Sequence, residues 1–177
     1  MKPERLAAIG ADHAAYHMKE ELKPFLKELG YPCLDFGTHS ADAVDYPDIV
    51  FSVAKAVVTG QASCGIVLCG TGIGSAIVAN KVPGARASLC HDTFSAKYAR
   101  AHNDANVLAM GARVIGMGLA REIVREWLAG KFEGGRHSRR VGKIERLEEQ
   151  LFTPEARVGS TLPPGAKDNE PQESQGG

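Results

Sequence analysis

The chain has 177 residues, of which 44% are apolar and 24% charged, a composition typical of a globular domain rather than a fibrous or disordered chain. Its 21 basic and 21 acidic side chains cancel to a formal net charge of +0, which gives no reason to expect nucleic acid or a membrane surface as a partner. No apolar run approaches the roughly 20 residues that span a bilayer, and no secretory signal is recognisable. We therefore expect a cytoplasmic protein.

Short apolar runs alternate with helical patterns along most of the chain. The predicted strands are residues 5–10, 32–36, 65–68, 85–90 and 107–110. The predicted helices are residues 14–29, 47–59, 75–82, 93–101, 119–129 and 139–151. Pro24 is expected to kink the first helix or shift its boundary, and Gly30 to end it. Alternation of this kind predicts an α/β fold, a parallel sheet with helices on both faces.

The composition changes near residue 153. Residues 153–177 contain few large apolar side chains and are rich in proline, glycine, serine and charge. Such a segment cannot bury enough apolar surface to offset the loss of chain entropy. We therefore expect one domain over residues 1–152 and a disordered tail over residues 153–177.

Three of the four cysteines have an ordinary interpretation. Cys33, Cys64 and Cys90 lie in apolar stretches, where a small buried side chain is expected. No two cysteines form a CxxC pair, and a disulfide framework is not expected in a chain of this size without a leader. These observations favour a reducing compartment and argue against a redox thiol protein.

The fourth cysteine opens a glycine-rich loop, in the stretch LCGTGIGSAIVANK at residues 68–81. The dinucleotide fingerprint GxGxxG fails in both registers, because Ser75 and Ile77 occupy the positions of the third glycine. The loop also lacks the Gly-Lys-Ser/Thr of a phosphate-binding P-loop. A nicotinamide or flavin oxidoreductase is therefore disfavoured, while an anion-binding turn and a purely structural turn both stay open.

Cys69 is expected at the carboxyl end of a strand, facing backbone amides and the start of a helix. Those surroundings favour the thiolate form of a cysteine. A thiolate beside amides that can stabilise an oxyanion has the parts of a general base. The alternative is a buried cysteine at a strand end with no chemical role.

Three further stretches carry polar side chains suited to chemistry. GADH at residues 10–13 ends the first predicted strand, and residues 101–116 hold His102, Asn103, Asp104, Asn106 and Arg113. EGGRHSRR at residues 133–140 gathers three arginines, whose guanidinium groups match phosphate geometry. Taken singly, His102 could also be a charge at a helix end, and the arginines a solvated face.

Together these segments resemble the ribose-5-phosphate isomerase B family, which includes galactose-6-phosphate isomerase subunits. The resemblance covers about residues 5–150 and rests on motifs in the expected order, namely GADH, DYP (45–47), CGTGIG (69–74), ANK (79–81), HNDANVLA (102–109), GARVIG (111–116) and GGRH (134–137). It implies a Rossmann-like three-layer sandwich with a five-stranded parallel sheet. It also implies interconversion of aldose and ketose phosphates without a metal or organic cofactor. Family members are dimers or tetramers with active sites across a subunit interface.

The resemblance implies a role for each matching residue. Cys69 would be the base that moves a proton between C1 and C2 through an enediolate, whose oxygens Thr71 and the loop amides would stabilise. His102 would open the sugar ring, with Asp12 as its acid/base counterpart. The implied substrate-binding residues are His13, Tyr46, Gly70, Gly72, Gly74, Ser75, Asn103, Arg113, Arg136, His137 and Arg140. His13, Arg136 and Arg140 would hold the phosphate, Arg113 would come from the partner subunit, and His137 is a weaker phosphate contact.

Ser75 stands where one branch of the family carries a catalytic glutamate, so the chain resembles the cysteine branch. The expected reaction is the interconversion of ribose 5-phosphate and ribulose 5-phosphate in the pentose phosphate pathway. Allose 6-phosphate, galactose 6-phosphate or a tetrose phosphate are alternative substrates. A non-catalytic sugar-phosphate-binding subunit is a further alternative, although one chain carries the cysteine, the histidine and the arginines together.

Overall fold

The computed structural model describes residues 5–152, so the tail predicted over residues 153–177 lies outside the described residues. Five parallel strands form one sheet in the order β2-β1-β3-β5-β4. The strands are β1 (Ala7–Ala11), β2 (Cys33–Asp35), β3 (Cys64–Cys69), β4 (Ala87–Leu89) and β5 (Val107–Gly111). All five strands lie within or overlap the predicted ranges, and the predicted parallel sheet is confirmed.

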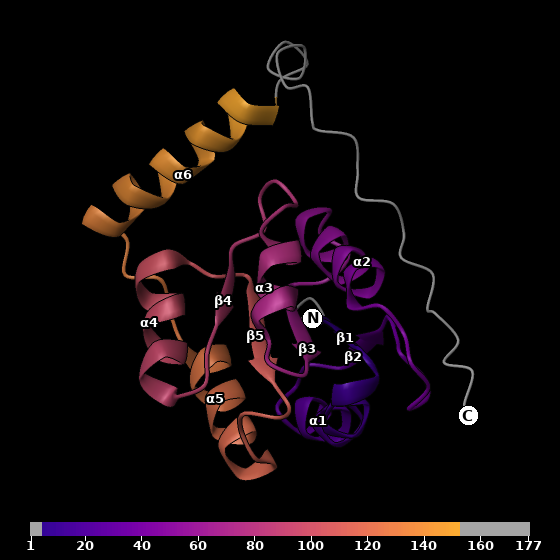
Figure 1. Cartoon of the computed structure of the whole chain (residues 1–177). Coiled ribbons are helices and arrows are strands. Elements are labelled where there is room, and N and C mark those ends of the chain that lie inside the picture. The colour runs from indigo at the N-terminus through magenta and orange to yellow at the C-terminus, as the bar shows by residue number, and fades with distance from the viewer. Residues whose placement is uncertain (1–4, 153–177) are drawn as a thin grey trace, which may run out of the picture.

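Helices cover both faces of the sheet and make three layers (Figure 1). The helices are the short 3-10 helix η1 (His13–Ala15), α1 (Tyr16–Glu28), α2 (Tyr46–Val58), α3 (Ile73–Ala79), α4 (Thr93–Asn103), α5 (Met117–Ala129) and α6 (Arg136–Phe152). One apolar core joins α1, α4 and α5 to one face, and a second core joins α2 and α3 to the other. The Rossmann-like three-layer sandwich is therefore confirmed.

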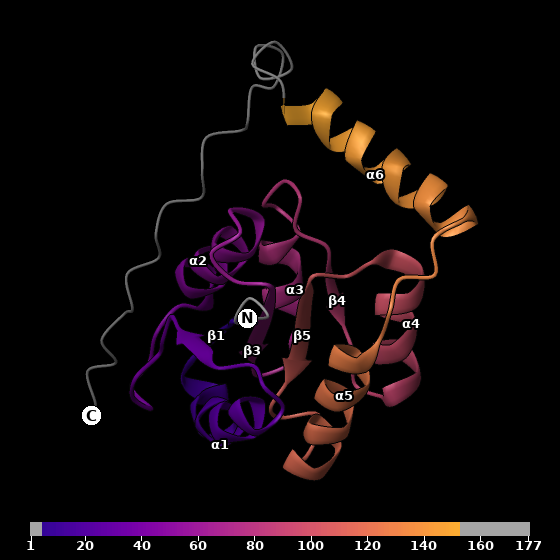
Figure 2. The ribbon, with the colours of Figure 1, turned by 180° about the vertical axis from the view of Figure 1, so that it is seen from behind.

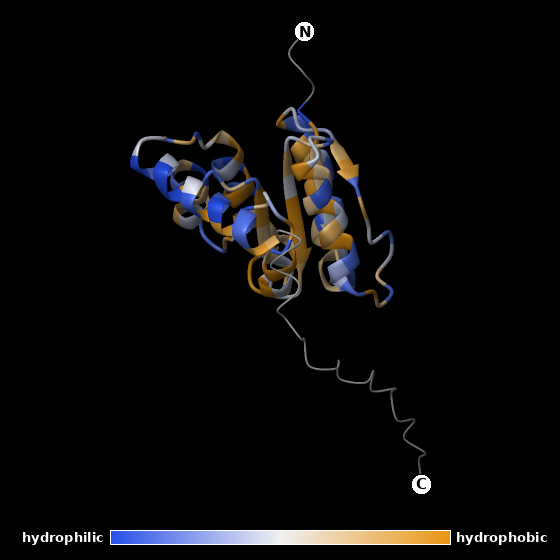
Figure 3. Cartoon of the chain, turned by 90° about the horizontal axis from the view of Figure 1, so that it is seen from above, coloured by the Kyte–Doolittle hydropathy of each residue, from blue (hydrophilic) through white to orange (hydrophobic). Residues whose placement is uncertain are grey.

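The central strands are apolar throughout because both of their faces are covered. Every residue of β1, β3 and β5 is buried. Successive side chains point to opposite faces, so Ile66 joins the core under α1 and α5 while Val67 joins the core under α2 and α3. Figure 3 shows these apolar strands in orange at the centre, with polar residues in blue on the helices outside.

From the sequence, Pro24 and Gly30 are expected to shape the first helix, α1. Pro24 lies inside α1, and the helix continues to Glu28, so this proline does not end it. Gly30 follows the helix with a φ of +83°, a conformation that glycine adopts without steric cost. The amide of Tyr31 then donates to the carbonyl of Leu26 at 2.8 Å, which closes the helix end.

The sheet has two opposite edges along the strand direction, one at the carboxyl ends of its strands and one at their amino ends. All strands are parallel, so their carboxyl ends meet at one edge, where ligands of such sheets bind. The helix α4 runs back between β4 and β5, so its last residues lie at the opposite edge. The arrowhead of β5 points away from α6, which starts at this opposite edge and extends away from the sheet (Figure 2).

The helix α6 starts earlier than predicted and is poorly covered. It begins at Arg136 rather than at residue 139, so the GGRH motif runs into its first turn. Among its residues only His137 and Val141 are buried. Ile144, Leu147 and Leu151 are 41%, 57% and 67% exposed and recur at helical spacing, so α6 presents an apolar stripe without a partner inside the described chain.

Candidate active site

Cys69 ends β3 and is only 5% exposed. The amide of Gly72 donates to its Sγ atom at 3.1 Å. Gly72 can turn back in this way because its φ of +77° is in the left-handed region. The helix α3 starts at the next residue, Ile73, so the thiol also lies close to a helix N-terminus. The Cys69 sulfur therefore faces an amide donor and the start of a helix.

The other three cysteines have surroundings of the opposite kind. Burial raises the pKa of Cys33, Cys64 and Cys90 to about 11 each, so their thiols stay protonated at neutral pH. All four cysteines are free. Cys64 and Cys90 are buried as predicted, whereas Cys33 is only half-buried because β2 is an edge strand. These three side chains therefore have a packing role.

The turn after β5 holds the glycine loop in place. The amide of Ala112 donates to the carbonyl of Cys69 at 3.0 Å, and the amide of Arg113 donates to the carbonyl of Gly70 at 2.9 Å. The Arg113 side chain lies so close to Gly70 that a β-carbon there would be 3.5 Å from its Cδ atom. Thr71 is exposed, and its Oγ1 accepts a hydrogen bond from Ile73 at 3.4 Å. The loop therefore presents its amides and one guanidinium together.

The segment after β1 approaches the same loop. Asp12 is 7% exposed, its amide donates to the carbonyl of Leu68 at 3.2 Å, and its Oδ1 accepts from the amide of Ala15 at 3.2 Å. The next side chain, His13, accepts a hydrogen bond at Nδ1 from the amide of Val44 at 3.3 Å. The sequence thus places a carboxylate and an imidazole beside the strand that carries Cys69.

Two more predicted residues complete this edge. Tyr46 starts α2, and its ring lies so close to Gly74 that a β-carbon there would be 2.6 Å from the Tyr46 hydroxyl. Ser75 is fully buried, and its Oγ has no hydrogen-bond partner among residues 5–152. We call the residues at this edge the Cys69 cluster, consisting of Asp12, His13, Tyr46, Cys69, Gly70, Thr71, Gly72, Gly74, Ser75 and Arg113.

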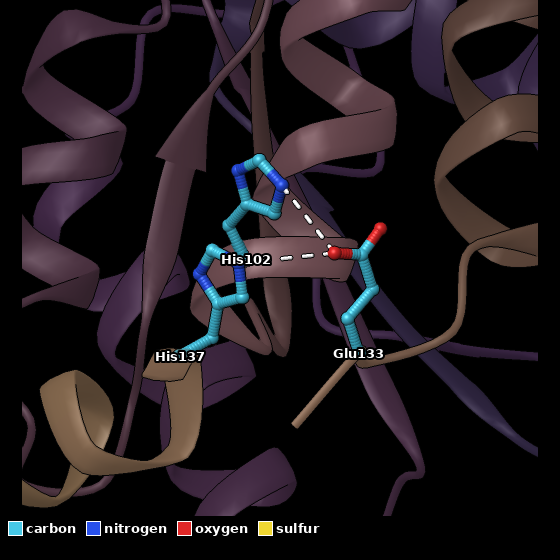
Figure 4. A group of neighbouring side chains, drawn as sticks. All are labelled: His102, Glu133 and His137. Carbon is cyan, nitrogen blue, oxygen red and sulfur yellow. Dashed lines mark ion pairs between the residues drawn. The ribbon is translucent and has the colours of Figure 1, made fainter. Parts of the chain in front are cut away.

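The remaining predicted residues form a second group, which we call the His102 cluster, consisting of His102, Asn103, Arg136, His137 and Arg140. The imidazole rings of His102 and His137 stack with their centroids 4.1 Å apart and their planes at 4° (Figure 4). The His102 ring also contacts the ring of Tyr98, with centroids 4.5 Å apart. Asn103 is exposed at the end of α4. This cluster joins the end of α4 to the start of α6.

The charges of the His102 cluster suit an anionic ligand. Burial lowers the pKa of His137 below its ordinary value. The neighbouring His102, Arg136 and Arg140 side chains act in the same direction, and the Glu133 carboxylate acts against them. The Nε of Arg136 donates to Nε2 of His137 at 3.3 Å, which requires that nitrogen to be unprotonated. Within residues 5–152 no carboxylate lies within 4 Å of the Arg136 or Arg140 guanidinium, so both are available to a phosphate.

The two clusters do not meet within one chain. The helix α4 starts at Thr93, just past the carboxyl edge of the sheet, and His102 lies nine residues further on. At 1.5 Å per residue this separation is about 14 Å along the helix axis. Arg113, which the resemblance implied to be the partner's contribution, instead lies against the Cys69 loop of its own chain. The edge opposite the carboxyl ends of the strands carries the His102 cluster, which consists of His102, Asn103, Arg136, His137 and Arg140.

The structure predicts unequal effects of alanine at neighbouring glycines of the loop. A β-carbon at Gly72 would lie 2.5 Å from Cδ1 of Leu89 and 2.7 Å from the carbonyl carbon of Met110, in addition to the strained φ. We expect Gly72→Ala to lower the free energy of unfolding by about 2 kcal/mol or more. Gly70→Ala is the matched control, because its β-carbon makes only an ordinary 3.5 Å contact with Arg113. Urea unfolding of both variants checks this, and equal loss of stability would contradict it.

The fold and these clusters define a class of protein: a parallel α/β domain with a thiol-bearing glycine loop, a buried carboxylate, and imidazole and guanidinium groups for an anionic small molecule. The comparisons with known proteins narrow this class. The family model described as Ribose/Galactose Isomerase matches residues 7–144. The chain therefore belongs to the ribose/galactose isomerase family, whose members of the ribose-5-phosphate isomerase B type are sugar-phosphate isomerases.

Individual relatives cover the same part of the chain. Ribose-5-phosphate isomerase B of Escherichia coli is 46% identical over 143 residues, covering 81% of this chain and 96% of the relative. D-erythrulose-4-phosphate isomerase of Pectobacterium atrosepticum is 47% identical over 144 residues, covering 81% of this chain and 95% of the relative. The solved structure of ribose-5-phosphate isomerase B of Clostridium thermocellum superimposes with a TM-score of 0.81 at 51% identity, covering 82% of this chain and 99% of that chain.

Sequence reasoning missed one residue of the His102 cluster's surroundings. Glu133 lies beside the stacked rings of His102 and His137, with its Oε2 at 3.7 Å from the Nε2 atom of each (Figure 4). The available signal was that Glu133 precedes His137 by four residues, a spacing that brings two side chains together on a helix. The signal is weak here, because Glu133 lies before α6 and not within it. No helix within residues 5–152 has the length and apolarity needed to cross a membrane.

Proposed function

We propose that the protein interconverts ribose 5-phosphate and ribulose 5-phosphate in the cytoplasm, as a step of the pentose phosphate pathway. The observation that carries this proposal is the contact of the Gly72 amide with the Cys69 Sγ atom. One loop thereby holds both the thiol, as the base that removes a proton from a carbon atom, and the backbone amides, as donors to the oxyanion that results. No metal or organic cofactor has a step in this reaction. Membership of a family of sugar-phosphate isomerases supports the assignment.

The proposed reaction begins with the opening of the sugar ring. The imidazole of His102 gives a proton to the ring oxygen of the sugar, while the carboxylate of Asp12 accepts the proton of the C1 hydroxyl. The Cys69 thiolate then takes the C2 proton of the open aldose. The electron pair moves into an enediolate. Asp12 then returns its proton to O1, His102 takes the proton of the C2 hydroxyl, and the Cys69 thiol returns the carbon-bound proton to C1 to give the ketose. Every bond made and broken is within the substrate or to these three groups.

Electrostatic stabilisation supplies much of the lowered barrier in this scheme. Charge develops on the two enediolate oxygens, and the loop amides and the Thr71 hydroxyl are the proposed hydrogen-bond donors to them. One preorganised donor of this type contributes about 3 kcal/mol to a transition state. Asn103 orients the sugar, Tyr46 closes the side of the site, and the phosphate is held by His13, Arg113, Arg136 and Arg140, with His137 beside them.

We further propose that the protein is a homodimer or homotetramer whose active site is shared between two subunits. The Cys69 cluster of one subunit would face the His102 cluster of the other, because a single chain holds them at opposite edges of the sheet. The exposed stripe of Ile144, Leu147 and Leu151 on α6 supports this assembly, since a helix with an uncovered apolar face needs a partner for stability.

The phosphate assignment predicts a defect in substrate binding for Arg136→Ala and Arg140→Ala. The two positions are one helical turn apart on α6, so both guanidinium groups can reach one phosphate. We expect KM for ribose 5-phosphate to rise roughly 10- to 100-fold in each variant, the loss of one charge-assisted contact. Arg139→Ala on the same helix is the matched control and keeps its KM within about threefold. Unchanged KM in both test variants would remove the phosphate assignment.

The substrate itself is tested by activity on a panel of sugar phosphates. A relative named for erythrulose 4-phosphate is as similar to this chain as a relative named for ribose 5-phosphate, so a tetrose phosphate is the second candidate. The panel contains ribose 5-phosphate, erythrulose 4-phosphate, allose 6-phosphate and galactose 6-phosphate. The highest kcat/KM on ribose 5-phosphate supports the proposal. Activity only on another sugar keeps the mechanism and changes the substrate, and no activity on any of them favours a binding subunit.

A further inference from the structure

Three side chains from three segments converge beside the His102 cluster (Figure 4). His102 comes from the end of α4, Glu133 from the connection between α5 and α6, and His137 from the first turn of α6. One nitrogen or oxygen atom of each side chain lies within 4.8 Å of the corresponding atoms of the other two. Two imidazoles and one carboxylate form a ligand set that binds Zn²⁺ and related transition metals, with a fourth position for water.

The distances are close to those of a metal site. The Glu133 Oε2 atom lies 3.7 Å from Nε2 of His102 and 3.7 Å from Nε2 of His137. Tetrahedral bonds of about 2.1 Å place neighbouring ligand atoms about 3.4 Å apart, so each of these two pairs needs to close by about 0.3 Å. The ligand nitrogens of the two histidines lie within 4.8 Å of one another and also have to approach. The two rings are parallel, and one of them has to turn before both lone pairs face a common ion. The His102 and Glu133 side chains are 33% and 56% exposed and have room for this rotation.

The backbone holds the three ligands near one another before any ion arrives. The amide of Glu133 donates to the carbonyl of Ala101, directly before His102 in the chain, at 3.0 Å. The amide of His137 donates to the carbonyl of Gly134, directly after Glu133, at 3.0 Å. Both histidines are therefore tied by backbone hydrogen bonds to the segment that carries the carboxylate, and metal binding requires only side-chain adjustment.

We propose that His102, Glu133 and His137 form a site for a divalent transition metal ion such as Zn²⁺, and that occupation of this site inhibits the enzyme. Metal binding takes the Nε2 lone pair of His102, so this imidazole can no longer carry the proton needed for ring opening. The inhibition rests on the proposed function of His102, whereas the metal site rests on the ligand geometry alone. The site is inhibitory and has no part in turnover.

One neighbouring cation opposes metal binding and supplies a diagnostic variant. The Arg136 Nε atom donates to the His137 nitrogen that the metal would take, at 3.3 Å. The metal therefore has to displace this contact and accept a nearby positive charge. If His137 is a ligand through this nitrogen, Arg136→Ala binds the metal more tightly than the unaltered protein. If the metal binds elsewhere on the chain, Arg136→Ala should leave its affinity unchanged.

Binding is measured first, independently of activity, by titrating the full chain with Co²⁺ and with Zn²⁺ in the absence of chelators. We expect one ion per chain, at least tenfold weaker binding in Glu133→Gln and in His102→Gln, and unchanged binding in Glu126→Gln, an exposed acid on the neighbouring α5. Visible absorption of bound Co²⁺ without a thiolate charge-transfer band is expected. A thiolate band, or equal affinity in Glu133→Gln, would overturn the site.

Inhibition is measured next, with each variant compared with its own rate in the presence of a chelator. Zn²⁺ at the concentration that fills the site is expected to reduce turnover at least tenfold, reversibly, and tenfold more Zn²⁺ to be needed in Glu133→Gln. Full activity with the site filled would overturn the inhibitory role. If Co²⁺ binds as expected but no sugar phosphate is isomerised, the metal site stands and the proposed isomerase function fails.

Discussion

Cys69→Ala is expected to lower kcat on ribose 5-phosphate roughly 1000-fold while the protein stays folded. A general base contributes about 100- to 10,000-fold to proton transfer, and alanine supplies no group that can replace the thiolate. The Gly72 amide that donates to Sγ would lose its partner, but the loop is also held by the backbone contacts of Ala112 and Arg113. The change should therefore affect the chemistry far more than the stability.

The matched control for this variant is Cys64→Ala, at the other end of the same strand. Cys64 is also buried, and burial raises the pKa of its thiol to about 11, so it offers no thiolate. Turnover of both variants and their thermal midpoints separate chemistry from folding. Cys64→Ala is expected to keep turnover close to that of the unaltered protein at a similar cost in stability. If Cys69→Ala retained more than a tenth of the original kcat, the base would have to be another residue.

Much of the fold could be predicted because local pattern and tertiary structure agree. The buried central strands read as short apolar runs, and the helices as amphipathic stretches between them. Lys19 is an exception, since a charged residue within a helical pattern is ordinarily placed on the surface. It is fully buried, and its ammonium lies 2.6 Å from a carboxylate oxygen of Asp35 at the end of β2. Burial opposes ionisation of Asp35, but Lys19 and Lys23 outweigh it and lower the pKa of this carboxyl.

The candidate site was predictable residue by residue, but its arrangement was not. The rule that ligands bind at the carboxyl ends of parallel strands locates the Cys69 cluster, since Asp12 and Arg113 follow strands and Cys69 ends one. His102 and Arg136 do not follow strands, so this rule says nothing about them. Their position depends on where α4 ends and α6 begins, and helix boundaries are set by capping and tertiary contacts that the sequence pattern specifies poorly.

The separation of the two clusters leads to the second large effect, the recovery of activity in mixed oligomers. Cys69→Ala and His102→Ala are each expected to be inactive or nearly so. In a mixed dimer of the two, one site combines an intact Cys69 cluster from one subunit with an intact His102 from the other, while the second site carries both defects. Random pairing of equal amounts makes half of the dimers mixed, so about a quarter of the unaltered activity should return.

The experiment refolds or co-expresses the two variants with different affinity tags and assays the doubly selected oligomers, which are all mixed and should therefore show about half of the unaltered activity. The control pair is Cys69→Ala with Asp12→Asn, two changes within the Cys69 cluster, for which every site of the mixed dimer is defective and no activity should return. If mixed oligomers of the first pair were isolated and remained inactive, the site would have to form within one chain. Recovery in the first pair and not in the second would assign Cys69 and Asp12 to one subunit of each site and His102 to the other, because only that division leaves one complete site.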